Sequence, residues 1–443
     1  MAAVNSILTN YAALSQIENN YLNASGTYIF LGKTDQWPDD NNPPVPSQSP
    51  AYIKQTFKNM FAIKKVTAAN IAAIVPRIDW ASGTVYEEYS DQVDNIATVD
   101  GVVTKQFYAR NSYDQIFKCV YNNKGGASTV EPAITPGNTD ISRALITSDG
   151  YKWIYITTID KGLKQKFFDD YWMPITFNDV APNTIGTYKL GSVDAINVAN
   201  TGFGYANGYA TTTVTISGDG VGATAQANVS DNRIVDIIVT NSGNNYTYAN
   251  VTITPVSPFG GSNATANIVL SPIAGNNYDP ASELGCNHLM YSVEFDKSEG
   301  GLIPTNMAFR QVGIIQYPIL ITGNTPSSGT YNTADLATVS FGIGSYINGE
   351  KVYQGSSLST ASYSATICSF DSSNNILSLI NTVGTPTLGT VINGVDSGSS
   401  RVLLSYSTPS FDVGSGYMSY IENRQPIQRS PNDVEQIRII LGF

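Results

Sequence analysis

Ionisable side chains are scarce in this sequence. Charged residues make up only 13% of the 443 positions, and the chain has one histidine, His288. A Ser-His-Asp or Cys-His nucleophile would have to use that histidine. His288 lies just ahead of a predicted strand, in ELGCNHLMYSV, where we expect a hydrogen-bonded structural role. The acidic pairs are sequence neighbours, which point to opposite faces of a strand and so do not indicate a glycosidase pair. We predict no catalytic residues.

Cysteine is also rare. Cys119, Cys286 and Cys368 lie far apart and form no C-x-x-C motif. Their odd number and their spacing are typical of free thiols in a reducing compartment. Cys286 and His288 could supply two zinc ligands, but the sequence has no second pair at ligand spacing. We therefore predict neither a metal site nor a bound cofactor.

Basic clusters and long apolar runs are missing as well. The formal net charge of -11 argues against binding to the phosphate backbone of nucleic acid, which needs clustered Lys and Arg. No window approaches the roughly 18 apolar residues of a membrane-spanning helix. Residues 1–22 have neither the basic start nor the apolar core of a signal peptide. We expect a soluble chain made in the cytoplasm, with no nucleic-acid partner and no membrane span.

Glycine, asparagine, serine, threonine and tyrosine take the place of the missing charges, and this composition favours strands and tight turns. The 27 tyrosines are spread along the whole chain, which favours packing and subunit contacts over one localised site. We predict a mainly β fold: a β-sandwich body with N-terminal helices and two inserted small β modules. The helices are expected near residues 4–14 and 51–73, the second ending before Pro76.

Two copies of one pattern occur at a period of roughly 41 residues. The first copy contains INVANTGFGY, VTI and GATAQANV, at residues 196–205, 214–216 and 222–229. The second contains IIVTNSGNNY, VTI and NATANIVL, at residues 237–246, 251–253 and 263–270. Each copy predicts three short strands. Because neither copy can bury a face alone, we expect the two to pack on each other.

These patterns divide the chain into five segments. They are the N-terminal part of the body with its helices (1–190), an inserted β-repeat module (191–271), a return to the body (272–322), an inserted β-barrel-like module (323–412) and the C-terminal strands that close the body (413–443). The barrel-like prediction rests on evenly spaced short strands with Gly and Asn turns. In the last segment we expect a strand over residues 417–422, a loop over residues 423–433 and a final strand to the end.

The final stretch, YIENRQPIQRSPNDVEQIRIILGF, resembles the C-terminus of the dimer-forming baseplate wedge subunit of contractile-tailed, T-even-like bacteriophages. Three upstream blocks resemble the same family in the same order: VPRIDW (75–80), DGYKWIYI (149–156) and AFRQVGIIQYPIL (308–320). The resemblance implies a structural protein of the virion that forms a homodimer and contacts other baseplate wedge subunits. It also implies a place in the tail baseplate after synthesis in the host bacterial cytoplasm.

Charged and aromatic residues in or near these blocks are candidate scaffold or interface anchors. Arg77 and Asp79 flank Ile78 in PRIDW, and Glu422 and Arg424 frame the ENR triplet. Arginine offers a planar fork for carboxylates, so we predict fixed ion pairs here, either within the chain or between subunits. The full set of candidates is Trp37, Arg77, Asp79, Trp80, Trp153, Arg310, Glu422 and Arg424.

The favoured hypothesis is a non-enzymatic structural subunit of a baseplate wedge. A receptor- or glycan-binding tail protein, with residues 191–271 as the reader, is the alternative. A polysaccharide-degrading enzyme is a third class, for which the sequence offers only the presence of carboxylates.

Overall fold

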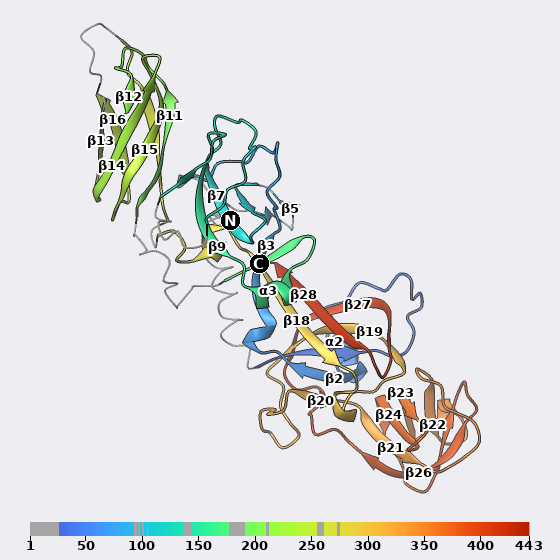
Figure 1. The fold of residues 1–443 in the computed structure, drawn as a ribbon. Coiled ribbons are helices and arrows are strands. Elements are labelled where there is room, and N and C mark those ends of the chain that lie inside the picture. The colour runs from blue at the N-terminus through green and yellow to red at the C-terminus, as the bar shows by residue number, and fades with distance from the viewer. Residues whose placement is uncertain are drawn as a thin grey trace. The chain divides into compact units, whose positions relative to one another are not determined.

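The structure is a computed structural model that describes residues 26–442, except residues 93–94, 96–97, 100–101, 104, 136–142, 177–190, 210–211, 255–260 and 273–274. Strands dominate, which confirms the predicted mainly β fold (Figure 1). The helix predicted near residues 4–14 lies outside the described residues. The chain divides into two compact units, one built on Ala72–Met290 and the other on residues 26–71 and Tyr291–Ile439. Strands β18 (His288–Asp296) and β28 (Val434–Gly442) each contain residues of both units.

The first unit contains an antiparallel sheet in the order β6-β7-β9-β8. Its strands are β6 (Tyr108–Arg110), β7 (Gln115–Tyr121), β8 (Leu145–Ile146) and β9 (Lys152–Thr158). The other elements outside the repeat region are β3 (Ile71–Pro76), β4 (Thr98–Val99), β5 (Val102–Val103), α3 (Lys161–Phe167), β10 (Trp172–Ile175) and α4 (Pro280–Glu283). Strand β10 pairs antiparallel with β3, and Asp160 caps α3.

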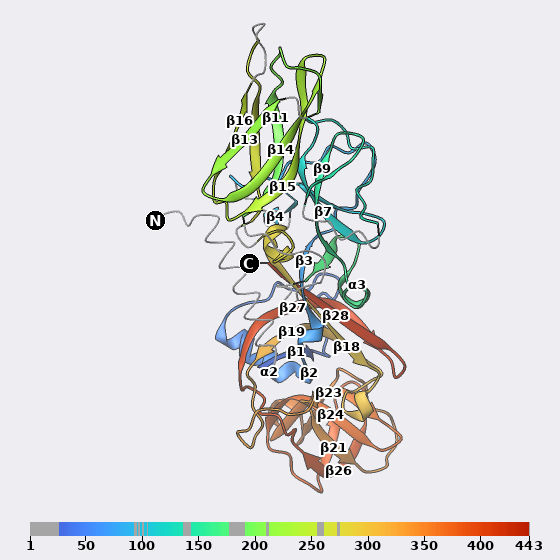
Figure 2. The ribbon, with the colours of Figure 1, turned by 60° about the vertical axis from the view of Figure 1, so that its left-hand side comes forward.

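The repeat region of the first unit folds as two sheets around one apolar core, and we call it the repeat module (Figure 2). Five strands pair in the order β12-β14-β15-β11-β17, and β13 pairs with β16. The strands are β11 (Val193–Asn200), β12 (Gly208–Tyr209), β13 (Thr213–Gly218), β14 (Val221–Ser230), β15 (Arg233–Asn244), β16 (Ala249–Thr254) and β17 (Thr265–Leu270).

The two sequence copies exchange equivalent contacts inside the repeat module. The first strand of each copy pairs with the third strand of the other, as β11 with β17 and β15 with β14, and the middle strands β13 and β16 pair together. This is the mutual packing that the repeat predicts. Gly202 and Gly243 occupy equivalent positions in the two copies, both with positive φ. A Cβ at either position would lie within 3 Å of backbone atoms of the other copy, so only glycine fits.

The second unit contains an antiparallel sheet in the order β20-β2-β1-β19-β27, which joins early and late parts of the sequence. Its strands are β1 (Thr27–Gly32), β2 (Met60–Lys65), β19 (Met307–Gln316), β20 (Thr330–Asn332) and β27 (Tyr417–Arg429). Aromatic and aliphatic side chains of these strands and of α2 (Pro50–Asn59) form its core, among them Tyr28, Phe30 and Phe57.

The predicted helix over residues 51–73 is wrong beyond its first nine residues. Helix α2 ends at Asn59, and the chain continues as β2, a short 3-10 turn (Ala68–Asn70) and β3. The physical reason is burial, because Met60–Ile63 and all six residues of β3 are buried, whereas a surface helix would expose one side. Pro76 therefore ends a strand rather than a helix.

A closed six-stranded barrel occupies residues 335–407 of the second unit, within the range for which the sequence predicts a barrel-like module (Figure 2). The strands follow the order β21-β24-β23-β22-β25-β26. Their bounds are β21 (Asp335–Val339), β22 (Lys351–Gln354), β23 (Tyr363–Asp371), β24 (Ile376–Gly384), β25 (Val391–Gly394) and β26 (Ser400–Ser407). Alternate residues such as Val352, Ile367 and Leu379 fill its interior.

The C-terminal loop predicted over residues 423–433 is also wrong, because β27 continues to Arg429 and only a short turn precedes β28. Pro426 is tolerated inside β27 because this is the edge strand of its sheet, with an irregular register beside Arg310.

The two compact units group residues differently from the five predicted segments. Residues 72–176 fall with the repeat module, whereas residues 26–71 fall with the barrel.

Candidate functional site

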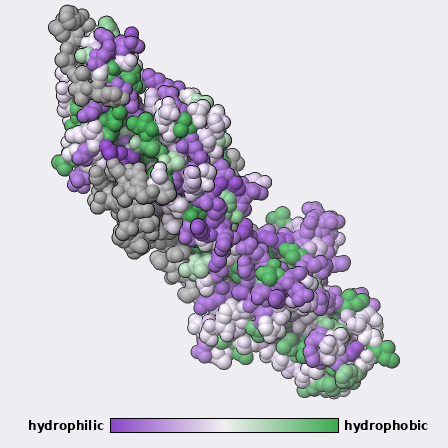
Figure 3. Space-filling model, in the orientation of Figure 1, coloured by the Kyte–Doolittle hydropathy of each residue, from purple (hydrophilic) through white to green (hydrophobic). Residues whose placement is uncertain are grey.

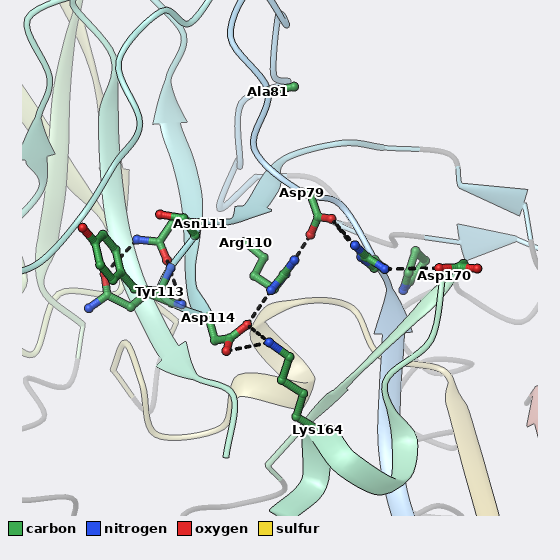
Figure 4. Close-up of polar contacts among 12 residues, drawn as sticks. Asp79, Ala81, Arg110, Asn111, Tyr113, Asp114, Lys164 and Asp170 are labelled. Atoms are coloured by element: carbon green, nitrogen blue, oxygen red, sulfur yellow. Dashed lines mark hydrogen bonds and ion pairs between the residues drawn. The ribbon is translucent and has the colours of Figure 1, made fainter. Parts of the chain in front are cut away.

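In the first unit, Arg77 and Asp79 form an ion pair within the chain. The Nη2 atom of Arg77 lies 2.7 Å from Asp79, and the Nε atom of Arg110 lies 2.7 Å from the other oxygen of the same carboxylate. Arg110 also pairs with Asp114, which accepts hydrogen bonds from Lys164 at 2.7 and 2.8 Å (Figure 4). Although burial acts to raise the pKa of Asp79, its hydrogen bonds from Arg110 and Arg77 lower it overall.

One aromatic ring lies beneath the three cations of this network. The Phe168 centroid is 4.7 Å from the Arg77 guanidinium, 4.8 Å from that of Arg110 and 5.2 Å from the Lys164 ammonium. Cations placed over a ring face gain cation-π attraction in addition to their ion pairs. The network therefore fixes the end of β3, the strand β6 and the helix α3 to one another. Arg110, Asp114, Lys164 and Phe168 were not among the candidate residues.

The two candidate tryptophans of the first unit, Trp80 and Trp153, are internal anchors. Trp80 donates its indole N–H to the Ser128 hydroxyl at 3.0 Å. Trp153 is fully buried, stacked on Tyr151 at 5.4 Å between centroids and in edge contact with Tyr86 at 5.3 Å. These contacts give Trp153 a packing role and leave it no exposed surface for a partner.

In the second unit, Trp37 and Arg310 hold the proline-rich loop of residues 33–49 against β19 and β27. The Trp37 indole N–H donates to the backbone carbonyl of Arg424 at 3.1 Å. Arg310 is 5% exposed and donates two parallel hydrogen bonds, of 2.8 and 2.7 Å, to the carboxylate of Asp40. It also donates to the Thr34 carbonyl at 2.7 Å. The loop is thus fastened from both strands, and we call this set of contacts the loop clamp.

Glu422 and Arg424 pair side by side on β27. Arg424 donates from Nε and Nη2 to the two oxygens of Glu422, at 2.8 and 3.0 Å. Between them, Asn423 bonds to the Tyr52 hydroxyl, to Gln311 at 2.8 Å and to the Pro44 carbonyl at 2.7 Å. Asn423 extends the loop clamp, and it lacks any charge or aromatic ring that would have marked it in the sequence.

Two buried lysines connect the β6-β7-β9-β8 sheet with the repeat module, and sequence reasoning missed both. Lys118 is fully buried, with its ammonium 3.2 Å from Glu283 and 3.5 Å from Asp194. Lys152 donates to the backbone carbonyls of Ile196 and Ile237 and pairs with Asp236 at 2.8 Å. Each lies in a strand rich in aromatic and aliphatic residues, QIFKCVY and KWIYITT. An isolated lysine in such a strand indicates a buried, paired lysine, and this was the signal that the sequence offered.

A groove of about 560 Å³ lies beside the repeat module. Its lining includes Tyr248, Asn250 and Asn267 from the module, and Asp91 and Gln92 from the loop ahead of β4. Tyr248 is 58% exposed, so its ring is accessible. The groove offers one aromatic face and several amides.

The barrel displays apolar side chains on a braced loop between β21 and β22. Phe341 is 89% exposed and Ile343 is 96% exposed. From within the barrel, the buried Arg401 donates to the carbonyls of Ser340 at 3.4 Å and Gly344 at 2.6 Å. The two hydrogen bonds bracket the exposed pair and hold it in place. Figure 3 shows hydrophobic atoms on the surface over the barrel.

The described residues contain no cluster of three or more His, Cys, Asp or Glu side chains suited to a metal ion. Cys119, Cys286 and Cys368 are free and buried. His288 rests on the Trp172 ring at 4.6 Å, and burial lowers its pKa.

Among the helices of the described chain, none is long and apolar enough to cross a membrane.

Comparison with known proteins identifies no relative: no family model matches the sequence, and no curated protein matches it. All five charged candidates have an ion-pair partner within the chain: Arg77, Asp79, Arg310, Glu422 and Arg424. Four of the eight candidates belong to each compact unit.

Proposed function

We propose that this chain is a non-enzymatic structural subunit of the baseplate wedge of a contractile-tailed bacteriophage. In this role it holds neighbouring wedge proteins together during assembly and infection. The proposal starts from the four sequence blocks that resemble the wedge family. The observation that carries it is that the polar residues of these blocks fasten the chain to itself, as Arg77 does with Asp79 and Arg310 with Asp40.

Such internal fastening suits a part that must transmit load without deforming. The ion-pair network over Phe168 and the loop clamp connect segments far apart in sequence, so that loops are held in one conformation before any partner binds. The braced apolar pair Phe341 and Ile343 is the kind of feature that a neighbouring subunit would cover. We propose a homodimer that also contacts other wedge subunits in the virion, after synthesis in the host cytoplasm.

Sedimentation velocity on the purified full chain at micromolar concentration tests the dimer, and labelling of intact tails with antibody against the chain tests its location. The proposal expects a dimer and label at the baseplate. A monomer that neither self-associates nor labels tails would contradict it.

A glycan-binding tail protein is the second candidate, and the groove beside the repeat module favours it. Tyrosine rings stack on sugar faces, and amides match sugar hydroxyls as both donors and acceptors. None of the described residues lining the groove is Lys or Arg, so neutral sugars fit better than anionic ones. A glycan array probed with the full chain tests this. Binding to a neutral sugar that Tyr248→Ala abolishes and Phe203→Ala preserves would support it, since Phe203 is an exposed aromatic outside the groove.

A further inference from the structure

Lys118 and Asn276 are in contact within the first unit although they are far apart in sequence. The Lys118 Nζ atom lies 2.6 Å from the Asn276 Oδ1 atom, across a separation of 158 residues. The lysine side chain is fully buried, and its ammonium lies 4.2 Å from the centroid of the Tyr89 ring. The amine thus contacts the oxygen of a carboxamide, and that oxygen is one covalent bond from the carbonyl carbon. Bulk water is excluded from the amine.

Two buried carboxylates complete the arrangement. Glu283 lies 3.2 Å from the Lys118 Nζ atom and is held in place by the backbone N–H of Asn277, at 2.6 Å. Asp194 accepts a hydrogen bond of 2.7 Å from the Asn276 Nδ2 atom and lies 3.5 Å from Lys118. One carboxylate therefore contacts the amine and the other contacts the amide nitrogen. The oxygen and the nitrogen of the Asn276 amide are thus both held by hydrogen bonds, the oxygen by Lys118 and the nitrogen by Asp194.

We propose that Lys118 and Asn276 form an intramolecular amide cross-link, an isopeptide bond, after the chain has folded, with Glu283 and Asp194 as its catalytic residues. This inference is independent of the proposed function, because it follows from the contacts of one buried cluster. A general base next to a nucleophile activates it by taking its proton, and prior alignment of the reacting groups removes much of the entropic barrier.

The reaction balances without an oxidant or a co-reactant. The Lys118 ammonium gives one proton to Glu283, and its lone pair attacks the Cγ atom of Asn276. A second proton passes from Nζ to Asp194 and on to Nδ2, the bond from Cγ to Nδ2 breaks, and ammonia leaves. The proton held by Glu283 follows as ammonia becomes ammonium. The lysine ammonium and the carboxamide thus become a secondary amide and one ammonium ion.

The directions of the pKa shifts in the cluster agree with these roles. Burial raises the pKa of Glu283 to about 7 and also raises that of Asp194, although the charge of Lys118 opposes both shifts. Each carboxylate can therefore hold a proton that Lys118 releases. Burial alone would lower the pKa of Lys118, but the two carboxylates outweigh it and raise it. The amine starts as an ammonium, so transfer of its proton to Glu283 must precede attack.

The cross-link would close the chain around the repeat module. Lys118 lies in β7, before the module, and Asn276 follows β17, its last strand. A force that pulls on the module would then load a covalent bond in addition to the hydrogen bonds of Lys152 and Asn197 at the same junction.

Mass spectrometry of the full chain, folded and incubated at neutral pH and then denatured, tests the proposal. The expected mass is lower than that of the sequence by one ammonia molecule. Trypsin should no longer cut after Lys118, and it should release residues 111–124 joined to residues 234–297. A full sequence mass, with normal cleavage after Lys118, would overturn the proposal on the wild-type protein alone.

Two variants separate the cross-link from other causes of ammonia loss. A succinimide at Asn276 would also release ammonia, but it would persist in Lys118→Arg and would leave cleavage after Lys118 intact. The proposal expects no loss of ammonia in Lys118→Arg, with the circular dichroism of the folded protein retained. Glu283→Gln keeps the size and one acceptor oxygen of the side chain but cannot take the proton from the ammonium, so the mass should again be that of its sequence. Ammonia loss in either variant at the wild-type extent would contradict the mechanism.

Discussion

The hydroxyl of Tyr205 accepts a hydrogen bond from the backbone N–H of Ala264 at 2.7 Å, across the two copies of the repeat. Tyr246 makes the equivalent contact in the opposite direction, accepting from the backbone N–H of Ala223 at 3.3 Å. Both rings are buried in the shared core of the module. Each copy therefore supplies a buried hydrogen-bond acceptor for a backbone N–H of the other copy.

Removing the Tyr205 hydroxyl should destabilise the repeat module. In Tyr205→Phe the N–H of Ala264 loses its buried acceptor, which costs about 1 to 2 kcal/mol of unfolding free energy. Tyr246→Phe should cost less, because its hydrogen bond is longer. Urea denaturation followed by tyrosine fluorescence measures both effects. The exposed Tyr248→Phe is the control and should leave the transition unchanged. Equal stability of Tyr205→Phe and the wild type would refute this description of the module.

Acid should weaken the network of Arg77, Asp79 and Arg110. The pKa of Asp79 is lower in the folded chain than its ordinary value of 3.8. Its stabilising contribution is therefore complete above that ordinary value and is lost as the pH falls through the lower, folded pKa. We expect the urea midpoint of the wild type to fall as the pH drops below about 4.

Asp79→Asn tests the same network by substitution. At neutral pH it should lower the unfolding free energy by about 1 kcal/mol, because the carboxylate is partly exposed to solvent. The midpoint of this variant should then depend less on acid than that of the wild type. Asp170→Asn is the matched control, since Asp170 is 94% exposed and 3.6 Å from Arg77, and it should change neither quantity. The same acid dependence in Asp79→Asn as in the wild type would show that other groups govern it.

Opening the loop clamp should expose residues 33–49 to proteases. Asp40→Ala removes both hydrogen bonds from the Arg310 fork and leaves a buried guanidinium without its carboxylate. Limited proteolysis, with cleavage sites read by mass spectrometry, should show faster cutting within this loop. Asp39→Ala removes the exposed neighbouring carboxylate and should leave the rate unchanged. Equal cleavage rates in the two variants would mean that the ion pair does not restrain the loop.

The exposed apolar pair of the barrel should matter for association and not for folding. Because Phe341 and Ile343 are almost fully exposed, Phe341→Ser with Ile343→Ser should leave the thermal unfolding midpoint unchanged. If a neighbouring subunit covers this loop, the double variant should weaken association in sedimentation velocity by tenfold or more, about 1.4 kcal/mol. Val45→Ser, at another exposed apolar residue, is the control. Loss of thermal stability in the double variant would place the pair inside the fold instead.

The sequence predicted best those features whose partners lie close together in the chain. The three strands of each repeat copy follow from local pattern, and the pairs Arg77 with Asp79 and Glu422 with Arg424 are two residues apart. The remaining members of the network, Arg110 and Lys164, come from a different strand and a helix, and no local pattern connects them to Asp79. The same holds for Lys118, whose partners Asp194 and Glu283 are brought to it only by the fold.

Two predictions failed because packing decided the local structure. Ile53 and Phe57 have helical spacing, but the residues that follow are apolar on both sides and pair with β1 as a buried strand. In the C-terminal stretch, prolines suggested a loop, yet an edge strand can carry Pro426 because that side of the strand needs no donor. Neither outcome is visible without knowing which strands become neighbours.

Electron cryomicroscopy of intact virions that carry this chain tests the central claim most directly. The account predicts density for the repeat module and the six-stranded barrel within the tail baseplate, in paired copies that touch other wedge proteins. Particles whose baseplates contain no such density, or in which the chain lies only at the tip of a receptor-binding fibre, would contradict it.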